Sequence, residues 1–428
     1  AGAASAATAP NKKPAMDQNP AFKAMGLPRL RLPSRNWLIF LSITGSIAGA
    51  ITYDRWQTRR VKQKWCDLVS HLAEEPLSSH HMPRRLTIYL AAPPADGLRS
   101  AREHFTNYIK PILVAGGMDW DVVEGRREGD VRFKTAERVR RKRKRGGEGE
   151  VLSEEEREKA FVVDMLREKA GTTEYPGVAG DLVIGRHAWK EYLRGLHEGW
   201  LGPPDAPPKL EETGVVDELD SAAHRPGQAS LGDAAVKGAV NVIEANTPGS
   251  AQSEDHPSDV SDAQKEEEEE KPKPRHPPPY ILPSAYASAQ LSPSTPETIG
   301  PSAPIRFPHI LGIRNTPIRV YRFLNRRYLA DAVGRDVAAA VLASSYRPYT
   351  HVAQKDEDSA PGVERTVPEQ TQVLAHEEKE WWKTVREPRK EHEESVWIEE
   401  VVLDERLAAR MRKFELSGED EVRARRIA

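Results

Sequence analysis

One stretch decides how the chain is organised: Trp37-Leu-Ile-Phe-Leu-Ser-Ile-Thr-Gly-Ser-Ile-Ala-Gly-Ala-Ile-Thr-Tyr53, seventeen residues without a charged side chain. As an α-helix that rises about 1.5 Å per residue, it would extend for roughly 26 Å, slightly less than the hydrocarbon core of a bilayer at about 30 Å. The rings of Trp37, Tyr53 and Trp56 and the long side chains of Arg35 and Arg55 suit the headgroup regions at its two ends. We therefore predict one transmembrane helix over residues 37–53, with these residues as interfacial anchors.

Two other interpretations of this stretch are weaker. A buried helix of a soluble protein can be equally apolar, but its flanks do not usually combine interfacial aromatic rings with arginine. A secretory signal peptide would start nearer the N-terminus and end at small residues, whereas this stretch continues into a charged helical pattern. Within the predicted span, Ser42, Gly45, Ser46 and Gly49 form a face of small side chains that would allow another membrane helix to approach closely.

The composition indicates one modest core and long unpacked segments. The 428 residues include 34 prolines and 29 glycines, and only 38% are hydrophobic. The formal net charge of −2 gives no overall attraction to nucleic acid or to membranes, so charge acts through local blocks. Cys66 is the single cysteine of the sequence, which excludes an intrachain disulfide and a cysteine-based zinc cluster.

The segments on both sides of the span are basic. Residues 1–36 are rich in alanine and proline, with Asp17 as their single acid, so we predict a disordered basic tail that loosely resembles a mitochondrial targeting segment. Residues 54–83 keep a helical pattern with Trp65 and Leu68 on one face, which predicts an amphipathic stem. Because both flanks are basic, the positive-inside rule gives no orientation for the span.

Residues 84–200 alternate between strand and helix patterns. Runs rich in β-forming residues predict strands, and apolar residues spaced three or four apart predict helices. The resulting order of strand, helix, strand, helix, helix, strand and helix is typical of a parallel α/β sheet with crossover connections. Strands are predicted over residues 86–91, 119–123 and 181–184, and helices over residues 98–113, 130–144, 153–170 and 186–200.

The remainder of the chain divides into three segments. Residues 201–302 are rich in proline, serine and charge runs, which predicts a long disordered insertion. Residues 303–345 hold helices that we expect to pack back on the α/β domain, and residues 346–428 are predicted to form a peripheral helical tail that holds partners. These helices are predicted to start at Asn315 and to cover residues 328–343, 368–387 with Trp381 and Trp382, and 401–414.

The sequence carries no signature of catalysis, so we expect no catalytic residue, no cofactor and no metal site. The turn after the first predicted strand has only Gly97, against the spaced glycines of a dinucleotide-binding or phosphate-binding loop. His197-Glu198 and His376-Glu377 each lack the second histidine of the H-E-x-x-H zinc motif. No serine stands in the G-x-S-x-G frame of a hydrolase nucleophile.

The densest charge feature is a basic tract made of Arg138, Arg140, Arg141, Lys142, Arg143, Lys144 and Arg145. A solvated helix end is the simplest interpretation, while a nuclear-localisation tract, a nucleic-acid patch and a site for anionic lipid headgroups stay open. Beside a membrane span, lipid contact is favoured over nucleic acid, because no interleaved aromatic rings offer base stacking. We therefore treat the tract as a candidate anionic-lipid patch and expect no nucleic-acid partner.

Six blocks of sequence carry a resemblance to a known family. They are Asn19-Pro20, Gly26-Leu-Pro28, Leu32-Pro-Ser-Arg-Asn-Trp37, Arg84-Arg-Leu-Thr-Ile-Tyr-Leu-Ala-Ala-Pro-Pro94, Tyr108-Ile-Lys-Pro-Ile-Leu113 and Asn315-Thr-Pro-Ile-Arg-Val-Tyr-Arg-Phe-Leu-Asn-Arg-Arg327. In this order they resemble the fungal "fifty-four" Tim subunit family of the mitochondrial carrier translocase. The resemblance covers most of the chain outside residues 201–302.

The resemblance implies a single-span protein of the mitochondrial inner membrane, with its N-terminus in the matrix and a large C-terminal domain in the intermembrane space. As partners it implies the other subunits of the carrier translocase, including the channel subunit, and the small Tim chaperones that deliver multi-spanning carrier proteins. The family has no catalytic residues to transfer to this sequence. The implied function is therefore that of a non-catalytic scaffold.

Two alternatives come from other classes of protein. One is a membrane-anchored α/β enzyme that acts on a nucleotide or a lipid headgroup, because parallel sheets often bind ligands at the carboxyl ends of their strands. The other is a protein of the endoplasmic reticulum or the nuclear envelope that uses the basic tract as an address. The sequence alone leaves both alternatives open.

Overall fold

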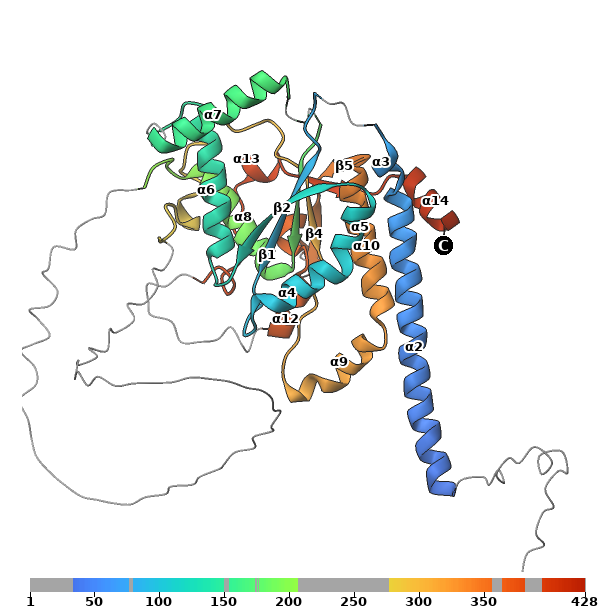
Figure 1. Ribbon diagram of the computed structural model, residues 1–428. Helices are drawn as coiled ribbons and strands as arrows, with labels where there is room; N and C mark the ends of the chain where they lie inside the picture. The colour runs from blue at the N-terminus through green and yellow to red at the C-terminus, as the bar shows by residue number, and fades with distance from the viewer. Residues whose placement is uncertain are drawn as a thin grey trace, which may run out of the picture.

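The computed structural model describes residues 34–76, 80–149, 154–173, 175, 177–206, 277–355, 364–381 and 395–427. Its centre is a six-stranded sheet with the strand order β2-β1-β3-β4-β8-β5 (Figure 1). Neighbouring strands are parallel except for β5 and β8, which are antiparallel. The predicted fold class, a mostly parallel α/β sheet that follows one long apolar N-terminal helix, is confirmed.

The strands of this sheet are short, and two further strands form a separate antiparallel pair. In the sheet they are β1 Arg85–Ala91, β2 Asp119–Gly125, β3 Gly180–Ile184, β4 Ser302–Ile305, β5 Ser345–Pro348 and β8 Arg412–Glu415; the pair consists of β6 His351–Lys355 and β7 Glu364–Pro368. The three strands predicted from β-rich runs are therefore present as β1, β2 and β3.

The helices alternate with the first strands, as the sequence pattern predicted. They are α2 Arg35–Val69, α3 His71–Glu74, α4 Leu98–His104, α5 Lys110–Ala115, α6 Asp130–Arg145, α7 Glu154–Ala170, α8 Arg186–Leu201, α9 Thr316–Phe323, α10 Arg326–Leu342, α11 Glu369–Gln372, α12 Ala375–Trp381, α13 Glu405–Ala408 and α14 Gly418–Ile427. A single π-helical turn, Phe105–Ile109, joins α4 to α5 within the helix predicted over residues 98–113.

Strand β1 is buried from its second residue onward, because it has a parallel neighbour on each side and helices on both faces. Its register pairs Ile88 with Val122 of β2 and with Leu182 of β3. Alternate residues point to opposite faces: Ile88 lies in the apolar layer with α5 and α10, and Tyr89 lies in the layer with α6 and α8. The core is therefore a helix-sheet-helix sandwich, which Figure 1 shows with α6 and α8 on one side and α5 and α10 on the other.

The C-terminal segment differs from the expected peripheral helical tail, because it completes the sheet. Strand β8 is followed in the strand order by β5, with Tyr346 opposite Phe414. The helix predicted over residues 401–414 is only the four-residue α13, and the chain then enters β8. Of the apolar residues whose spacing suggested a longer helix, Leu407 is buried on α13 and Met411 is buried directly before β8, whereas Val402 is exposed.

The second predicted helix of this segment, over residues 368–387, is present as the short helices α11 and α12. Trp381 at the end of α12 is buried, so its ring packs inside the domain and is not an exposed surface for partners. Its ring lies edge-on to Trp397, with the ring centroids 6.5 Å apart. Trp382 lies outside the described residues.

Part of the segment predicted as a disordered insertion is described and packs on the domain. Residues 277–302 cross the C-terminal ends of α6 and α8 as an irregular strap, with the rings of Tyr286 and the side chain of Ile299 buried. The Ser292 amide donates to the carbonyl oxygen of Trp200 at 3.2 Å. Apolar side chains between the prolines and polar contacts, such as those of Glu148 with Ser292 and Ser294, together hold the strap. Residues 207–276 of the predicted insertion lie outside the described residues.

The carboxylate of Glu369, on α11, links the strands β5 and β8 at the edge of the sheet. Its oxygens accept from the Arg347 guanidinium of β5 at 2.7 and 2.9 Å and from the Lys413 ammonium of β8 at 2.9 Å. Burial by itself raises the pKa of this carboxyl, but the hydrogen bonds from Arg347 and Lys413 outweigh it and lower the pKa to about 2. The ionised form therefore stabilises the fold, and this stability is lost as the pH falls from about 4.5 towards 2.

We predict that Glu369→Gln lowers the melting temperature at pH 7 and removes part of the acid sensitivity, because a neutral amide keeps only weak hydrogen bonds to the two cations. Thermal unfolding of the detergent-solubilised chain at pH 7 and pH 3 measures this effect. The control is Glu75→Gln, at an exposed carboxylate that follows α3. Equal loss of stability on acidification in Glu369→Gln and in the unsubstituted chain would contradict the prediction.

Candidate functional site at the membrane-proximal junction

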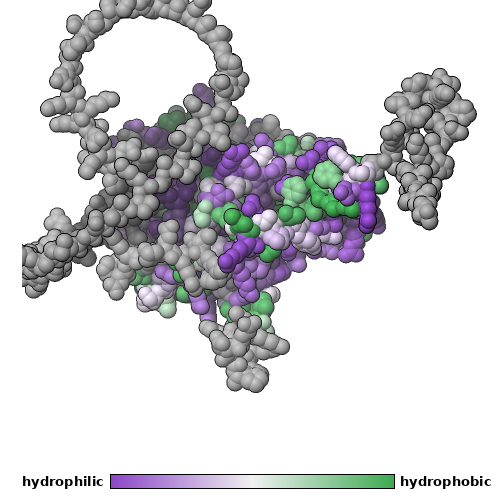
Figure 2. Space-filling view, turned by 90° about the horizontal axis from the view of Figure 1, so that it is seen from below, coloured by the Kyte–Doolittle hydropathy of each residue, from purple (hydrophilic) through white to green (hydrophobic). Residues whose placement is uncertain are grey.

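Helix α2 has two parts with opposite surroundings. Every residue from Arg35 to Ala50 is exposed, although most of this part is apolar. The later part packs into the domain, with Trp65, Leu68 and Val69 buried in the core. Figure 1 shows the apolar part extending away from the domain, and Figure 2 shows hydrophobic residues gathered at this end of the molecule. A single unbroken helix therefore joins the candidate span to the core.

The packed part of α2 is fitted closely against α10. The Trp65 indole nitrogen donates to the Asp331 carboxylate at 3.0 Å, and the indole ring lies over the backbone of Gly334. A Cβ atom at Gly334 would come within 2.3 Å of the Trp65 ring. The glycine is needed for this contact, because any side chain there would separate the two helices.

Asp54, the first residue after the candidate span, connects α2 to the start of α10. The residue is only 3% exposed. Its carboxylate accepts from the backbone amides of Arg326 and Arg327 at 3.2 and 3.4 Å and from the Arg327 guanidinium at 3.2 Å. The first amides of a helix have no partner within the helix, and its dipole favours a negative charge there. Asp54 and this first turn of α10 form what we call the membrane-proximal junction.

The predicted anchor residues lie around this junction and at the far end of the span. Arg35, Trp37 and Arg55 are exposed, as are Tyr53 and Trp56, whose ring centroids are 6.5 Å apart. The guanidinium of Arg327 lies 5.7 Å from the centre of the Tyr53 ring, and that of Arg60 lies 4.9 Å from the centre of the Trp56 ring. The aromatic anchors near Asp54, Tyr53 and Trp56, thus each lie beside an arginine.

The predicted contact face on the span is open in the described chain. A Cβ atom at Gly45 or Gly49 would meet nothing within 4 Å. The hydroxyl groups of Ser42 and Ser46 donate to backbone carbonyls three residues earlier, at 3.2 and 2.9 Å. These hydroxyls therefore need no partner from outside the helix, and the face offers mainly a close approach of backbones.

The basic tract lies at the C-terminal half of α6, and the fold uses several of its charges internally. Arg140 is buried and donates to the Glu198 carboxylate at 2.6 Å, and buried Arg143 donates to the carbonyls of Gly199 and Gly202 at 2.7 Å each. The other side chains are less enclosed: Arg138 binds Thr87, Arg141 pairs with Glu137, Lys144 pairs with Asp205, and Lys142 and Arg145 are exposed.

The position of the tract also separates it from the span. Helices that follow parallel strands run back along them, so α6 ends at the edge of the sheet where the strands begin. In Figure 1 this end lies beside α7, on the opposite side of the domain from the exposed part of α2. Arg140 and Arg143 are buried against structural partners. Lipid contact stays a prediction for the more accessible members of the tract, which are Arg138, Arg141, Lys142, Lys144 and Arg145.

The carboxyl edge of the sheet, where α/β enzymes bind ligands, is filled by the chain's own carboxylates. Glu377 accepts from the Arg186 amide at the start of α8 at 2.9 Å and from the Phe307 amide at 2.7 Å. Glu191 accepts from the Val131 amide at the start of α6 at 2.9 Å. Burial raises the pKa of both carboxyls to about 7, against the opposing effect of these hydrogen bonds.

Aromatic and imidazole rings occupy the space next to these carboxylates. Phe307 lies between His104 and His187, with ring centroids 5.0 and 5.9 Å away. Burial lowers the pKa of both imidazoles to about 4, so neither carries a charge near neutral pH. These groups form a packed polar layer with little access for a substrate.

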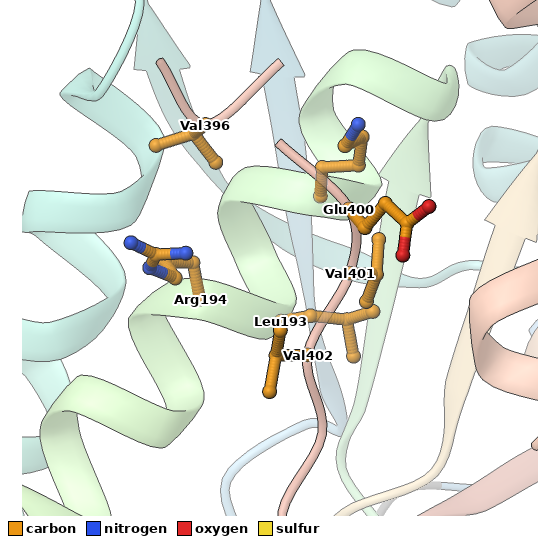
Figure 3. Close-up of a pocket in the computed structure, with 7 residues that line it drawn as sticks. Leu193, Arg194, Val396, Glu400, Val401 and Val402 are labelled. Carbon is orange, nitrogen blue, oxygen red and sulfur yellow. The ribbon is translucent and has the colours of Figure 1, made fainter. Parts of the chain in front are cut away.

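A shallow pocket lies between α8 and the segment over residues 396–402 (Figure 3). Its cavity of about 10 Å³ has room for about one water molecule, far less than a nucleotide or lipid headgroup needs. Within the described ranges, no group of histidine, cysteine and acidic residues could hold a metal ion. The pocket between α8 and residues 396–402 is lined by Lys190, Leu193, Arg194, Val396, Glu400, Val401 and Val402.

The fold and the junction define a class of protein: a membrane protein with one candidate N-terminal span whose helix continues into the core of an α/β domain. The sequence matches the family described as "Inner membrane protein import complex subunit Tim54" over residues 19–414. This chain belongs to the Tim54 family. It is therefore a subunit of the import translocase of the mitochondrial inner membrane, and the interpretation as a protein of the endoplasmic reticulum or nuclear envelope is set aside.

Relatives with the same description support this assignment along nearly the whole chain. A mitochondrial import inner membrane translocase subunit tim54 from Aspergillus oryzae is 47% identical over 416 residues, which cover 94% of this chain and 88% of that protein. The Aspergillus fumigatus protein is 44% identical, covering 91% and 89%. The Saccharomyces cerevisiae protein is 27% identical, covering 96% and 97%.

We predict that Asp54→Ala lowers the free energy of unfolding by about 1 to 2 kcal/mol, because two amides in the first turn of α10 and the Arg327 guanidinium lose their acceptor. Asp54→Asn, which keeps an acceptor oxygen without the charge, should cost less. Asp67→Ala, at an exposed acid on the same helix, is the control. Thermal unfolding of the solubilised full chain, followed by tryptophan fluorescence, measures all three. Equal melting temperatures for Asp54→Ala and Asp67→Ala would show that the junction does not stabilise the domain.

Proposed function

We propose that this chain is a non-catalytic scaffold subunit of the translocase that inserts multi-spanning carrier proteins. The single observation that carries the proposal is the continuity of α2, which leaves the candidate span and enters the core without a break. About eleven residues separate Asp54 from Trp65, a rise of roughly 16 Å along a helix. The domain is thus held close to the membrane and fixed in orientation, which suits a platform for other subunits.

The filled carboxyl edge of the sheet favours the interpretation as a scaffold and argues against that as an enzyme. Helix N-termini at this edge are the usual sites for phosphate groups, and here Glu191 and Glu377 occupy those of α6 and α8. A nucleotide would have to displace two buried carboxylates and face their charge. The alternative of a membrane-anchored nucleotide or headgroup enzyme has no supporting observation among the described residues.

We further propose which parts of the chain bind which partners. The small-residue face of the span would pack against another membrane helix of the translocase, such as that of the channel subunit, since the described chain leaves this face open. The α/β domain would dock the small Tim chaperones from the intermembrane space. This assignment requires the N-terminus in the matrix, because span and domain lie on opposite sides of Asp54 along α2.

The small-residue face can be tested by adding bulk to it. We expect Gly45→Leu combined with Gly49→Leu to reduce copurification of other translocase subunits from mild-detergent extracts, because backbones could no longer approach closely. Ile43→Phe combined with Ile47→Phe adds bulk to the opposite side of the same helix and serves as the matched control. Both pairs should remain in the membrane after carbonate extraction. Equal subunit recovery from the two variants would contradict this role of the face.

Chaperone docking and orientation can be tested together by chemical cross-linking in isolated mitochondria. The full chain should cross-link to small Tim chaperones, and a chain ending at residue 83 should insert but lose these cross-links. The reason is that the shortened chain keeps the span and lacks the sheet. Unchanged chaperone recovery from the shortened chain would reject docking on the domain. Cross-links from the full domain to matrix proteins alone would reject the proposed orientation.

A further inference from the structure

Helix α9 has its charged and apolar sides reversed relative to an ordinary surface helix. Its Arg322 guanidinium is turned towards the domain, where it pairs with the Glu380 carboxylate of α12, with one N–O distance of 2.9 Å. At about 100° per residue, Val320 and the C-terminal neighbour of the helix, Leu324, lie nearly opposite Arg322, and Tyr321 lies at the flank next to them. No residue of α9 is buried. The helix thus presents its apolar side outward.

The exposed apolar surface is extended by Ile313, the first residue of the 3-10 turn Ile313–Asn315 that precedes the helix. Ile313 is 91% exposed, and Val320 and Tyr321 are 50% and 66% exposed. A soluble domain rarely holds so many large apolar side chains outward on one short segment. The sequence predicts that both helices of residues 303–345 pack back on the α/β domain; α10 does so, whereas α9 projects from it. Something outside the described chain is therefore needed to cover this surface.

The membrane-proximal junction fixes the level of α9 relative to the span. Only two residues separate α9 from α10, and the first turn of α10 is bonded to Asp54, directly after the span. In Figure 1, α9 is the lowest element of the domain, on the side towards which the apolar part of α2 extends. Figure 2 views this side and shows small groups of hydrophobic residues among hydrophilic ones. The surface of a bilayer crossed by α2 would lie at this level.

The charges of the segment fit an anionic lipid surface. Residues 313–327 contain five arginines and no acidic residue. Arg322 and Arg327 pair with Glu380 and Asp54 of other segments, so the attraction to lipid falls mainly to the other three, Arg314, Arg319 and Arg326. Each basic residue near a negative membrane surface contributes about 1 kcal/mol of attraction. The Arg326 guanidinium lies 4.5 Å from the centre of the Phe323 ring, an arrangement suited to the headgroup region. Apolar, aromatic and cationic side chains together are the composition of a helix that lies in a membrane interface.

We propose that residues 313–327, centred on α9, lie in the headgroup region of the bilayer that α2 crosses and form a second attachment of the domain to it. The occupant of the apolar side is lipid, because the segment is held beside the end of the span and its charge is purely basic. The proposal rests on α2 being a transmembrane helix, and it does not depend on which partners the domain binds. With two attachments, the domain cannot rotate about the axis of α2.

The test uses the full chain reconstituted in vesicles of phosphatidylcholine and phosphatidylglycerol that carry nitroxide-labelled acyl chains. In a Cys66→Ser background, Ile313→Cys or Val320→Cys receives an environment-sensitive fluorophore. Val163→Cys is the matched control, because Val163 is an equally apolar residue, 45% exposed, on α7 at the opposite side of the domain. We expect a blue-shifted emission and nitroxide quenching at positions 313 and 320, and neither at position 163.

Two outcomes would overturn the proposal. One is the absence of lipid quenching at both 313 and 320 while a label within the span, at Ile47→Cys, is quenched. The other is a label at 320 that responds only when other translocase subunits are added, which would make the surface a protein contact. All three labelled positions of the domain are exposed, so misfolding is not expected, and the unfolding temperature of each variant verifies this. Failure of the span label to be quenched would instead reject the transmembrane assignment and, with it, this proposal.

Discussion

The structure depends on the interaction between the Asp54 carboxylate and the first turn of α10. This contact joins Asp54 to Arg326 and Arg327, which are 272 and 273 positions away in the sequence. It lies where the helix leaves the candidate span. An acid at this position serves two helices at once, because it ends the apolar run of α2 and supplies the missing acceptor at the start of α10. The rest of the packing between these helices, including Trp65 over Gly334, extends the same alignment towards the core. The helix of the candidate span is therefore joined to the α/β domain at this carboxylate and by the packing of Trp65 beyond it.

The same device recurs at the other helices around the sheet. Glu191 and Glu377 supply acceptors to the starts of α6 and α8, and Glu198 pairs with both Arg132 and Arg140 between the two helices. These buried charges are costly to desolvate and stabilise only when every partner is in place. In an α/β enzyme, such helix starts are left free for a phosphate. In this chain they are bonded to the chain's own carboxylates and help to close the domain.

Much of the fold could be predicted from the sequence, because the relevant signals are local. The apolar run over residues 37–53 and the β-rich run Leu86–Ala91 identify their elements without reference to any other part of the chain. The late strands could not be predicted, because Arg412-Lys-Phe-Glu415 has a single apolar side chain and becomes a strand only beside β4 and β5. The candidate site shows the same limit. Arg140 in the basic tract looked like a free cation, since its partner Glu198 lies on another helix, and Asp54 looked like the mere end of a span.

The continuity of α2 has a mechanical consequence. A hydrophobic segment shorter than the local bilayer costs a fraction of a kcal/mol per Å of mismatch, which membranes and proteins relieve by thinning or by changes of tilt. In this protein α2 is one unbroken helix from the candidate span to the core. A change of its tilt in the lipid would therefore rotate the whole sheet by the same angle. The local thickness of the bilayer and the height of the far side of the domain above the membrane would thus change together. A locally thinned membrane would shift the position of α7 as well as that of Tyr53.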